Sequence, residues 1–550
     1  MKIKYAYIIL SILTASVITG CHKEEIIIPP DPLTVENDIS EIRFSSGVSE
    51  MSFGITAKSD WHLTMTGEGF SAEPAVGKAG TYTITVTSEQ QESPETEQTL
   101  GNLTIVVDHS PVKHNIRITL PARSKKVVMA YFLGTSLSYY FNRNLEAMKT
   151  AVSRGSLGDD RLIILGQSSQ NYGAIEEIFY NEREGKSCKS TICKFALPEK
   201  LTAESFGDYL KRMMEIAPAD NYSLIILGHS KAWLPSHPAT ATFGIRRRPS
   251  WQTADGADVT RDLGERNVLL ELDDLKNGLA ATGKKFDCIY FDVCFMASTE
   301  SAYALRDNAE YIIGSPCEIM GEGSPYDRIL EPLFANDLAK VCSEYYDYYQ
   351  YTYPSWKSGC ISTIVCGKLD ALADAAKRIN ASQNIAEDFD ITAIQPYEGR
   401  DDHIFFDTED YIRRLCTDAD LVDGYKKALD ECVINRHHTA GFYSAYNHAM
   451  TPVTYYSGMN VTPDERCFEP IGSHIARTAE SYALKCAERD KLKEELEAQG
   501  KEPGTSEQYN SLAREANRLA NLKNTLEKQK SILEYYNPSL RLTDWYKATH

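Results

Sequence analysis

A cysteine and a histidine that each follow an apolar run are the residues of this sequence best suited to nucleophilic chemistry. Cys294 comes just after the run 286–292, and His229 comes just after the run 222–227. A cysteine thiolate is a strong nucleophile, and a nearby imidazole can take up and return its proton. Each residue alone has an ordinary alternative, because cysteine is among the most buried residue types and a histidine after a strand can simply cap a loop.

The two apolar runs are predicted to be parallel strands of one sheet, with the probable helix 270–281 in the crossover between them. Carboxyl ends of parallel strands meet at one sheet edge, where open α/β sheets place their active-site crevices. Residues 297–305 have helical spacing, and a helix start near Cys294 would favour its thiolate. The sequence therefore predicts a thiol and an imidazole at the same edge.

The block 291–297, Phe-Asp-Val-Cys-Phe-Met-Ala, followed by Glu-Ser-Ala-Tyr at 300–303, resembles the catalytic-cysteine motif of the clostripain-like (C11) cysteine peptidases. The resemblance is good over 125–364 and thinner beyond. The family's usual Asn-His-Gly appears here as Gly-His-Ser, with His229 kept. The resemblance implies a cysteine endopeptidase of caspase-like fold, with Cys294 as nucleophile and His229 as acid and base.

The resemblance also implies the specificity. Asp292 matches the acid that lines the family's S1 pocket, and a carboxylate there pairs with a guanidinium or ammonium group, so cleavage after Arg or Lys follows. The alternative is a structural Asp that bonds loop amides. Family members often have a second acid in the loop beyond the next strand. Glu318 or Glu322 could supply it, and we include Glu322 in the predicted pocket.

A basic cluster after His229 suggests processing. Relatives are cleaved by their own activity in a comparable loop, so self-cleavage is predicted after Arg246 or Arg247, with a solvated charge cluster as the alternative. The residues themselves predict no cofactor, and calcium is the option that the resemblance implies, because some relatives need it. The thirteen cysteines have no zinc-site spacing; Cys188 and Cys193 come closest, and a disulfide between them is the other option.

The N-terminus predicts export. Residues 1–20 resemble a lipoprotein signal peptide and 18–21 a lipobox, so that Cys21 would be lipidated; a plain signal peptide is the alternative. A proline-containing tether covers 21–37. Residues 38–122 alternate like antiparallel strands and predict a small Ig-like β-sandwich that resembles the BACON module, proposed to bind glycans or act as a spacer. Trp61 is expected in its core rather than as a sugar platform.

From residue 123 to 550 strands and helices alternate, which predicts an α/β domain with a mainly parallel sheet. The resemblance makes it a three-layer caspase-like sandwich. Its predicted strands are 127–133, 161–165, 223–227, 288–291, 310–314 and 360–365. Residues 475–535 predict a helical hairpin inserted in this domain, with 536–545 non-helical after it.

The composition limits the classes of molecule that this protein is expected to bind. The 550 residues include 58 Lys and Arg against 77 Asp and Glu, a net charge of -19 that disfavours nucleic acid and anionic lipid surfaces and suits basic substrates. We expect protein or peptide substrates with basic residues before the cleaved bond, and a lipid-mediated attachment to a bacterial cell envelope. The expected place is the outer membrane, with exposure on the cell surface as a further expectation. A catalytically inactive peptidase-like protein that binds glycans or proteins is the alternative. No Gly-x-Ser-x-Gly follows a strand, which disfavours a serine hydrolase.

Overall fold

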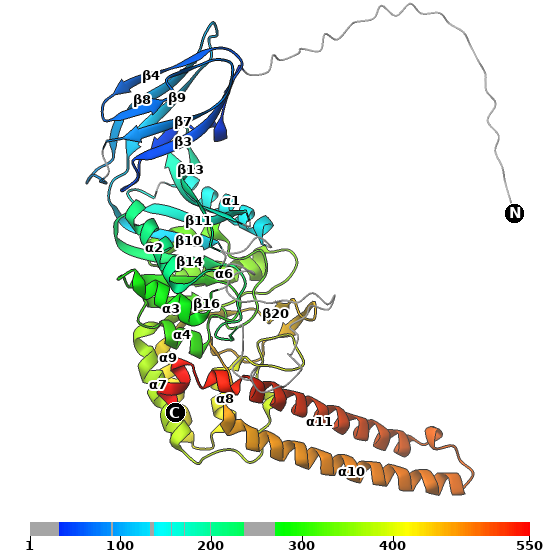
Figure 1. The fold of residues 1–550 in the computed structure, drawn as a ribbon. Coiled ribbons are helices and arrows are strands. Elements are labelled where there is room, and N and C mark those ends of the chain that lie inside the picture. Colours follow the sequence, from blue (N-terminus) through cyan, green and yellow to red (C-terminus); the bar gives the residue numbers. More distant parts are fainter. Residues whose placement is uncertain are drawn as a thin grey trace, which may run out of the picture.

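The structure, a computed structural model, describes residues 32–89, 92–132, 137–155, 157–169, 171–198, 200–235 and 270–550. An all-β body comes first, an α/β body follows, and a pair of long helices projects from the far end (Figure 1). Among the described residues, no helix is long and apolar enough to cross a membrane.

The N-terminal body is a sandwich of two sheets. One has the order β1 (Leu33–Val35), β3 (Glu50–Ala57), β7 (Gly80–Ser88), β5 (Phe70–Glu73), and the other the order β2 (Glu41–Arg43), β9 (Lys113–Leu120), β8 (Gln98–Val107), β4 (Trp61–Gly67), β6 (Val76–Gly77). Alternate residues of β3 are buried, as expected for a strand with one face on a core. Because β1 pairs with β3, the sandwich begins at Leu33, inside the stretch assigned to the tether.

Trp61 belongs to the core of this sandwich, as expected. Its side chain is 1% exposed and packs edge-to-face on Tyr82, with 5.2 Å between the ring centroids. A Cβ at Gly77 would lie 2.6 Å from the indole, so the glycine lets the neighbouring strand approach the ring closely. Trp61 is therefore not a surface platform for a sugar.

The second body is built on a nine-stranded mixed sheet, and the predicted α/β class with a mainly parallel centre is confirmed. All six predicted strands are present. The sheet order is β13 (Lys186–Ala196), β12 (Tyr172–Asn181), β11 (Arg161–Ser169), β10 (Ser124–Phe132), β14 (Ala219–Leu227), β15 (Phe286–Asp292), β16 (Ala309–Gly314), β17 (Cys360–Val365), β19 (Val433–His438). The five strands from β11 to β16 in this order run parallel to one another. At the two ends of the sheet, the pairs β11–β12, β12–β13, β16–β17 and β17–β19 are antiparallel.

Helices cover both faces of the sheet, which gives three layers. Along β10, Val127, Met129 and Tyr131 join one core, and Val128, Ala130 and Phe132 join the other. One face is covered by α1 (Ser138–Arg154), α5 (Tyr326–Phe334) and α6 (Leu338–Asp347). The other is covered by α2 (Ala203–Ile216), α3 (Leu272–Ala281), α4 (Thr299–Leu305), α7 (Leu369–Ala381) and α9 (Ala419–Cys432). Burial on both faces explains the continuous apolar runs of the central strands.

Short elements complete the α/β body beside the carboxyl ends of β15 and β16. They are β18 (Phe406–Asp407), α8 (Thr408–Leu415), β20 (Gly441–Ser444), β21 (Ala449–Pro452) and β22 (Asn460–Val461). The pair β18 and β22 forms its own small antiparallel ladder, and so does the pair β20 and β21.

Helices α10 (Phe468–Ala498) and α11 (Glu507–Leu540) form the predicted hairpin, which projects from the body (Figure 1). The prediction that 536–545 is non-helical is wrong. Helix α11 continues through Pro538 to Leu540, and α12 (Asp544–Thr549) follows. Tyr536, Leu540 and Trp545 are almost fully buried, so packing against the body outweighs the local effect of the proline.

The sandwich is fixed to the second body by a buried ionic cluster. Arg161 on β11 donates to both carboxylate oxygens of Glu177 on β12, at 2.8 and 3.0 Å, and to the hydroxyl of Ser45 in the sandwich at 2.8 Å. Arg43 of the sandwich adds a second guanidinium, 3.7 Å from Glu177. Asn181 also donates to Ser40 across the boundary, at 3.0 Å. These bonds make the sandwich part of one packed unit.

Candidate active site

His229 and Cys294 follow two neighbouring parallel strands at equivalent positions. In the ladder between β14 and β15, Leu227 is paired with Asp292. His229 lies two residues beyond Leu227, and Cys294 two residues beyond Asp292. The two residues therefore follow adjacent strands at the same edge of the sheet, and neighbouring strands lie about 4.8 Å apart. The placement predicted from the sequence is confirmed.

Cys294 lies in a tight turn that neighbouring backbone defines. The residue is 6% exposed, and its Sγ accepts a hydrogen bond from the backbone N–H of Ile319 at 3.4 Å. The next residue, Phe295, has φ +63°, a left-handed conformation that is costly for a bulky side chain. Its N–H donates to Cys317 O at 3.1 Å. An N–H aimed at sulfur favours the thiolate over the thiol.

Helix α4 begins at Thr299, five residues beyond the cysteine, with Ser298 as its N-cap. The helix therefore starts two residues later than the predicted 297, and a contribution of its N-terminus to the Cys294 thiolate stays a prediction. The N–H that bonds to the sulfur is that of Ile319, from the loop after β16.

Asp292 closes β15 directly before the Cys294 turn, and it is buried. Its Oδ2 accepts hydrogen bonds from the Tyr326 hydroxyl at 2.6 Å and the Ser324 N–H at 3.0 Å, whereas Oδ1 has no partner among the described residues. Burial raises the pKa of Asp292, and these hydrogen bonds only partly oppose the rise. Gly323, with φ +68°, lets the loop touch the carboxylate, because a Cβ there would lie 2.6 Å from Oδ2.

The two acids considered for the second pocket position have different surroundings. Glu318 is buried and accepts bonds from the Ser444 hydroxyl and, at 2.8 Å, the Ala445 N–H, so it anchors the β20–β21 hairpin. Glu322 is partly exposed, accepts the Tyr353 hydroxyl at 2.7 Å, and directly precedes Gly323 against Asp292. Glu322 is the acid that lies on the Asp292 side.

The remaining cysteines of the described part are free thiols, including Cys188 and Cys193 on β13, so the suggested disulfide between these two is absent. Burial raises the pKa of Cys342 and Cys366 to about 12, which makes them inert core residues at neutral pH. Within the described ranges, no group of three or more His, Cys, Asp or Glu side chains is arranged to hold a metal ion. Calcium dependence stays a prediction.

Several predicted sites lie outside the described residues: Cys21, Arg246 and Arg247. No role was predicted for Tyr326, Ser324 or the Ile319 N–H, which bond to Asp292 and Cys294. They lie within 125–364, where the resemblance to the family is good. Backbone donors, however, leave no signal in residue type.

Comparison with known proteins gives consistent matches. The sequence model described as the Clostripain family matches residues 131–434. A secreted C11 cysteine protease from Bacteroides thetaiotaomicron is 28% identical, with a TM-score of 0.56 over 62% of this chain and 94% of that one. An inactive zymogen C11 protease from Parabacteroides distasonis is 26% identical, with a TM-score of 0.52 over 64% and 95%. No curated protein matches.

Proposed function

The chain belongs to the clostripain family of cysteine peptidases, and we propose that it hydrolyses peptide bonds after arginine or lysine, with Cys294 as nucleophile and His229 as acid and base. The observation that carries the specificity is the Oδ1 atom of the buried Asp292, which has no hydrogen-bond partner within the described ranges. A buried carboxylate without full compensation is unfavourable on its own. A guanidinium or ammonium group of a substrate would supply the missing partner.

The proposed reaction uses the two residues that follow β15 and β14, Cys294 and His229. The Cys294 thiolate attacks the carbonyl carbon of the basic residue, and the negative charge moves to the oxygen of that carbonyl. Backbone N–H groups, that of Cys294 and one beside His229, are the proposed donors to this oxygen. His229 protonates the leaving amine as the C–N bond breaks, which leaves a thioester. Water then hydrolyses the thioester, with His229 taking the water's proton.

Glu322 is the proposed second acid of the S1 pocket. It precedes Gly323, the residue that touches Asp292, and it keeps part of its surface exposed. A carboxylate at the pocket mouth attracts a cationic side chain before that side chain reaches Asp292. Glu318 is better explained as an anchor of the β20–β21 hairpin.

The first experiment measures cleavage of fluorogenic peptides that end in Arg, Lys or norleucine. We expect hydrolysis of the Arg and Lys peptides only, abolished in Cys294→Ala and reduced at least a hundredfold in His229→Ala. Cys193→Ala, which removes a half-buried thiol far along the sheet, is the matched control and keeps full activity. Cleavage of the norleucine peptide at an equal rate would remove the specificity proposal while leaving the peptidase.

Self-cleavage after Arg246 or Arg247 is proposed for the segment after His229. The wild-type chain would then yield a new N-terminus at residue 247 or 248, and Cys294→Ala would stay intact. An intact, active wild-type chain would contradict it.

No cleavage of any peptide, even after limited trypsin nicking near Arg247 and added calcium, would favour the alternative of a catalytically inactive peptidase-like protein that binds glycans or proteins. This alternative is considered because the residues beside His229 differ from the family pattern.

Attachment to the outer membrane of a bacterial cell envelope through a lipidated Cys21 is proposed from the lipobox-like sequence 18–21. A fatty-acid label incorporated in growing cells would appear on the wild-type protein and be absent from Cys21→Ser. A processed but unlabelled wild-type protein would instead indicate a plain signal peptide. Protease accessibility on whole cells would test surface exposure.

Glycan binding by the sandwich stays a prediction, and the buried Trp61 does not contribute to it.

A further inference from the structure

A short segment of the chain, residues 460–462, bonds to both loops of the proposed dyad, and we name it the strap. We propose that the strap holds the Cys294 turn and the His229 loop in register, with Asn460 and Thr462 as positioning residues. The inference rests on the proposed roles of Cys294 and His229. The strap lies beyond residues 131–434, the part that the family model matches.

Asn460 ties the strap to the cysteine turn. Its backbone N–H donates to Ala297 O at 2.9 Å, and its side-chain amide donates to Phe295 O at 3.3 Å and Pro316 O at 2.7 Å. Asn460 itself is completely buried. One side chain therefore joins the turn that carries Cys294 to the loop after β16, which supplies the N–H bonded to Sγ.

The turn needs this support because it is strained. Phe295 is left-handed, with φ +63°, directly after Cys294. Such a conformation is unfavourable for a bulky side chain and persists only where the surroundings hold it. The Phe295 ring is stacked on Phe405 at 4.8 Å between centroids, and its carbonyl accepts the Asn460 amide. Loss of the amide would allow the turn to relax and to re-aim the thiol.

Thr462 ties the strap to the histidine loop. Its hydroxyl accepts a hydrogen bond from the indole N–H of Trp233 at 3.0 Å, and Trp233 is four residues after His229. This loop is strained as well, since Ala232 has φ +55° and donates its N–H to the Ser230 hydroxyl at 2.9 Å. Both catalytic loops thus contain a left-handed residue beside a bond to the strap.

The N–H of Thr462 fixes the strap a second time, by donating to the Glu300 carboxylate at 2.8 Å. Glu300 is in the first turn of α4 and fully buried. Burial raises the pKa of Glu300 to about 7, so this acceptor is only partly ionised at neutral pH. The strap therefore contacts the cysteine turn, the helix after it and the histidine loop within three residues.

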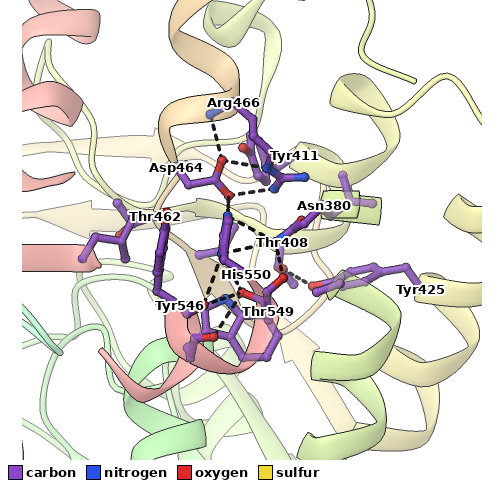
Figure 2. Close-up of a pocket in the computed structure, with 15 residues that line it drawn as sticks. Asn380, Thr408, Tyr411, Tyr425, Thr462, Asp464, Arg466, Tyr546, Thr549 and His550 are labelled. Carbon is purple, nitrogen blue, oxygen red and sulfur yellow. Dashed lines mark hydrogen bonds and ion pairs between the residues drawn. The ribbon is translucent and has the colours of Figure 1, made fainter. Parts of the chain in front are cut away.

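The back of the strap is braced by the end of the chain. Figure 2 shows Thr462 on the wall of a cavity that α12 and the C-terminal His550 close. His550 approaches Asp464 at 3.6 Å, and Asp464 is paired with Arg466 at 2.7 Å. The cavity holds about 20 Å³, room for one water, so it is no ligand site. A packed brace suits a positioning role.

The test is a conservative series at Thr462 in the full chain. Thr462→Val keeps the shape and the backbone bond to Glu300 but removes the acceptor for Trp233. We expect kcat on the Arg peptide to fall about tenfold with KM within twofold, and Thr462→Ser to restore kcat. Trp233→Phe should cost a similar factor, and the double variant no more than either single one. Equal kcat in wild type and Thr462→Val, or independent multiplying losses, would overturn the proposal.

Tyr425→Phe is the matched control. It removes a buried hydroxyl from the same cavity, where the Tyr425 and Thr408 hydroxyl oxygens are 2.6 Å apart (Figure 2). We expect a lower Tm with unchanged kcat. A fall in kcat as large as that of Thr462→Val would mean that any loss of packing here slows catalysis, and the strap would have no special role.

A substrate-independent readout separates this proposal from the proposed function. The rate at which iodoacetamide alkylates Cys294, followed by mass spectrometry of the peptide that contains it, reports the thiol's setting even in a chain that cleaves nothing. We expect Asn460→Ala to change this alkylation rate at least fivefold in protein that is folded and has an unchanged Tm. Tyr425→Phe should leave the alkylation rate unchanged. An unchanged rate in folded Asn460→Ala would contradict the strap. A wild-type chain without peptidase activity would contradict only the proposed function.

Discussion

Two buried carboxylates, Glu177 and Asp292, show how differently this molecule treats a charge. Glu177, between the sandwich and the sheet, receives two hydrogen bonds from Arg161 and lies 3.7 Å from Arg43. Asp292, at the catalytic edge, receives hydrogen bonds from uncharged groups, among them the Tyr326 hydroxyl and the Ser324 N–H, and one of its oxygens is left without a partner in the described part of the chain. Both side chains are at most 5% exposed.

The pKa values follow this difference. Burial disfavours the ionised form of both acids, but Arg161 and Arg43 outweigh it at Glu177 and bring its pKa below the usual value. At Asp292 burial prevails and the pKa is raised. Arginines of the same chain balance the structural acid, whereas the proposed specificity acid has no cation partner among the residues that the structure describes. An incompletely paired buried carboxylate therefore marks a place where a cationic group of a substrate is expected to bind.

Replacing Asp292 should have the largest effect. Asp292→Asn removes the charge that would pair with a basic substrate, so kcat/KM on the Arg peptide should fall about a thousandfold, equivalent to about 4 kcal/mol, with no loss of Tm. Asp287→Asn, on the same strand but paired with Lys126 at 3.3 Å, is the control. Peptide kinetics and thermal melting check both. An equal loss on a norleucine peptide would show that Asp292 is structural.

Replacing Glu177 should give the opposite result. Glu177→Gln leaves Arg161 buried without its partner, and the free energy of unfolding should fall by about 3 kcal/mol, with kcat unchanged in the folded protein. Because the pKa of Glu177 is lowered, its contribution is present above its usual pKa of 4.5 and is lost as the pH falls further. Denaturant unfolding at pH 7 and pH 4 measures this. The control Glu182→Gln, at an exposed position, should leave the free energy of unfolding unchanged. A Glu177→Gln variant as stable as wild type would contradict the stabilising role of Glu177.

The raised pKa of Asp292 predicts a pH-dependent affinity. A guanidinium binds the ionised carboxylate, so binding to the free protein weakens as the pH falls through the raised pKa and proceeds with proton uptake by the buffer. For an Arg-ended peptide bound to Cys294→Ala, we expect about a tenfold weaker Kd at pH 4 than at pH 8 by calorimetry. A norleucine-ended peptide should show no such trend. A flat profile for the Arg peptide would mean that Asp292 does not meet the cation.

Glu322 should matter least. Tyr353→Phe removes the hydrogen bond that holds the Glu322 carboxylate, and we expect about a threefold smaller preference for Arg over norleucine, with Glu322→Gln giving a similar change. Competition between the two peptides measures the ratio. Tyr351→Phe, a tyrosine 74% exposed on the same segment, is the control. A change as large as that of Asp292→Asn would reverse the ranking of the two acids.

The sequence was sufficient for the parts whose signals are local. The apolar runs before His229 and Cys294 predicted two parallel strands, and the register of β14 and β15 confirms it. The β12–β13 hairpin was missed because charges such as Glu177 interrupt its pattern, and only the fold shows the arginine that neutralises this charge. The strap was also out of reach. A two-residue strand has no periodicity, and its bonds join positions more than 140 residues apart.

The way the sandwich sits against the sheet also bears on self-association. Strand β13 ends the nine-stranded sheet, and an unpaired terminal strand offers a template for another chain. Here the sandwich strands stand beside it across a groove of about 480 Å³, and Lys189 and Lys194 of β13 line that groove. A bulky neighbour and positive charges both discourage an incoming strand. The docked sandwich thus disfavours edge-to-edge pairing of two copies of this chain at β13.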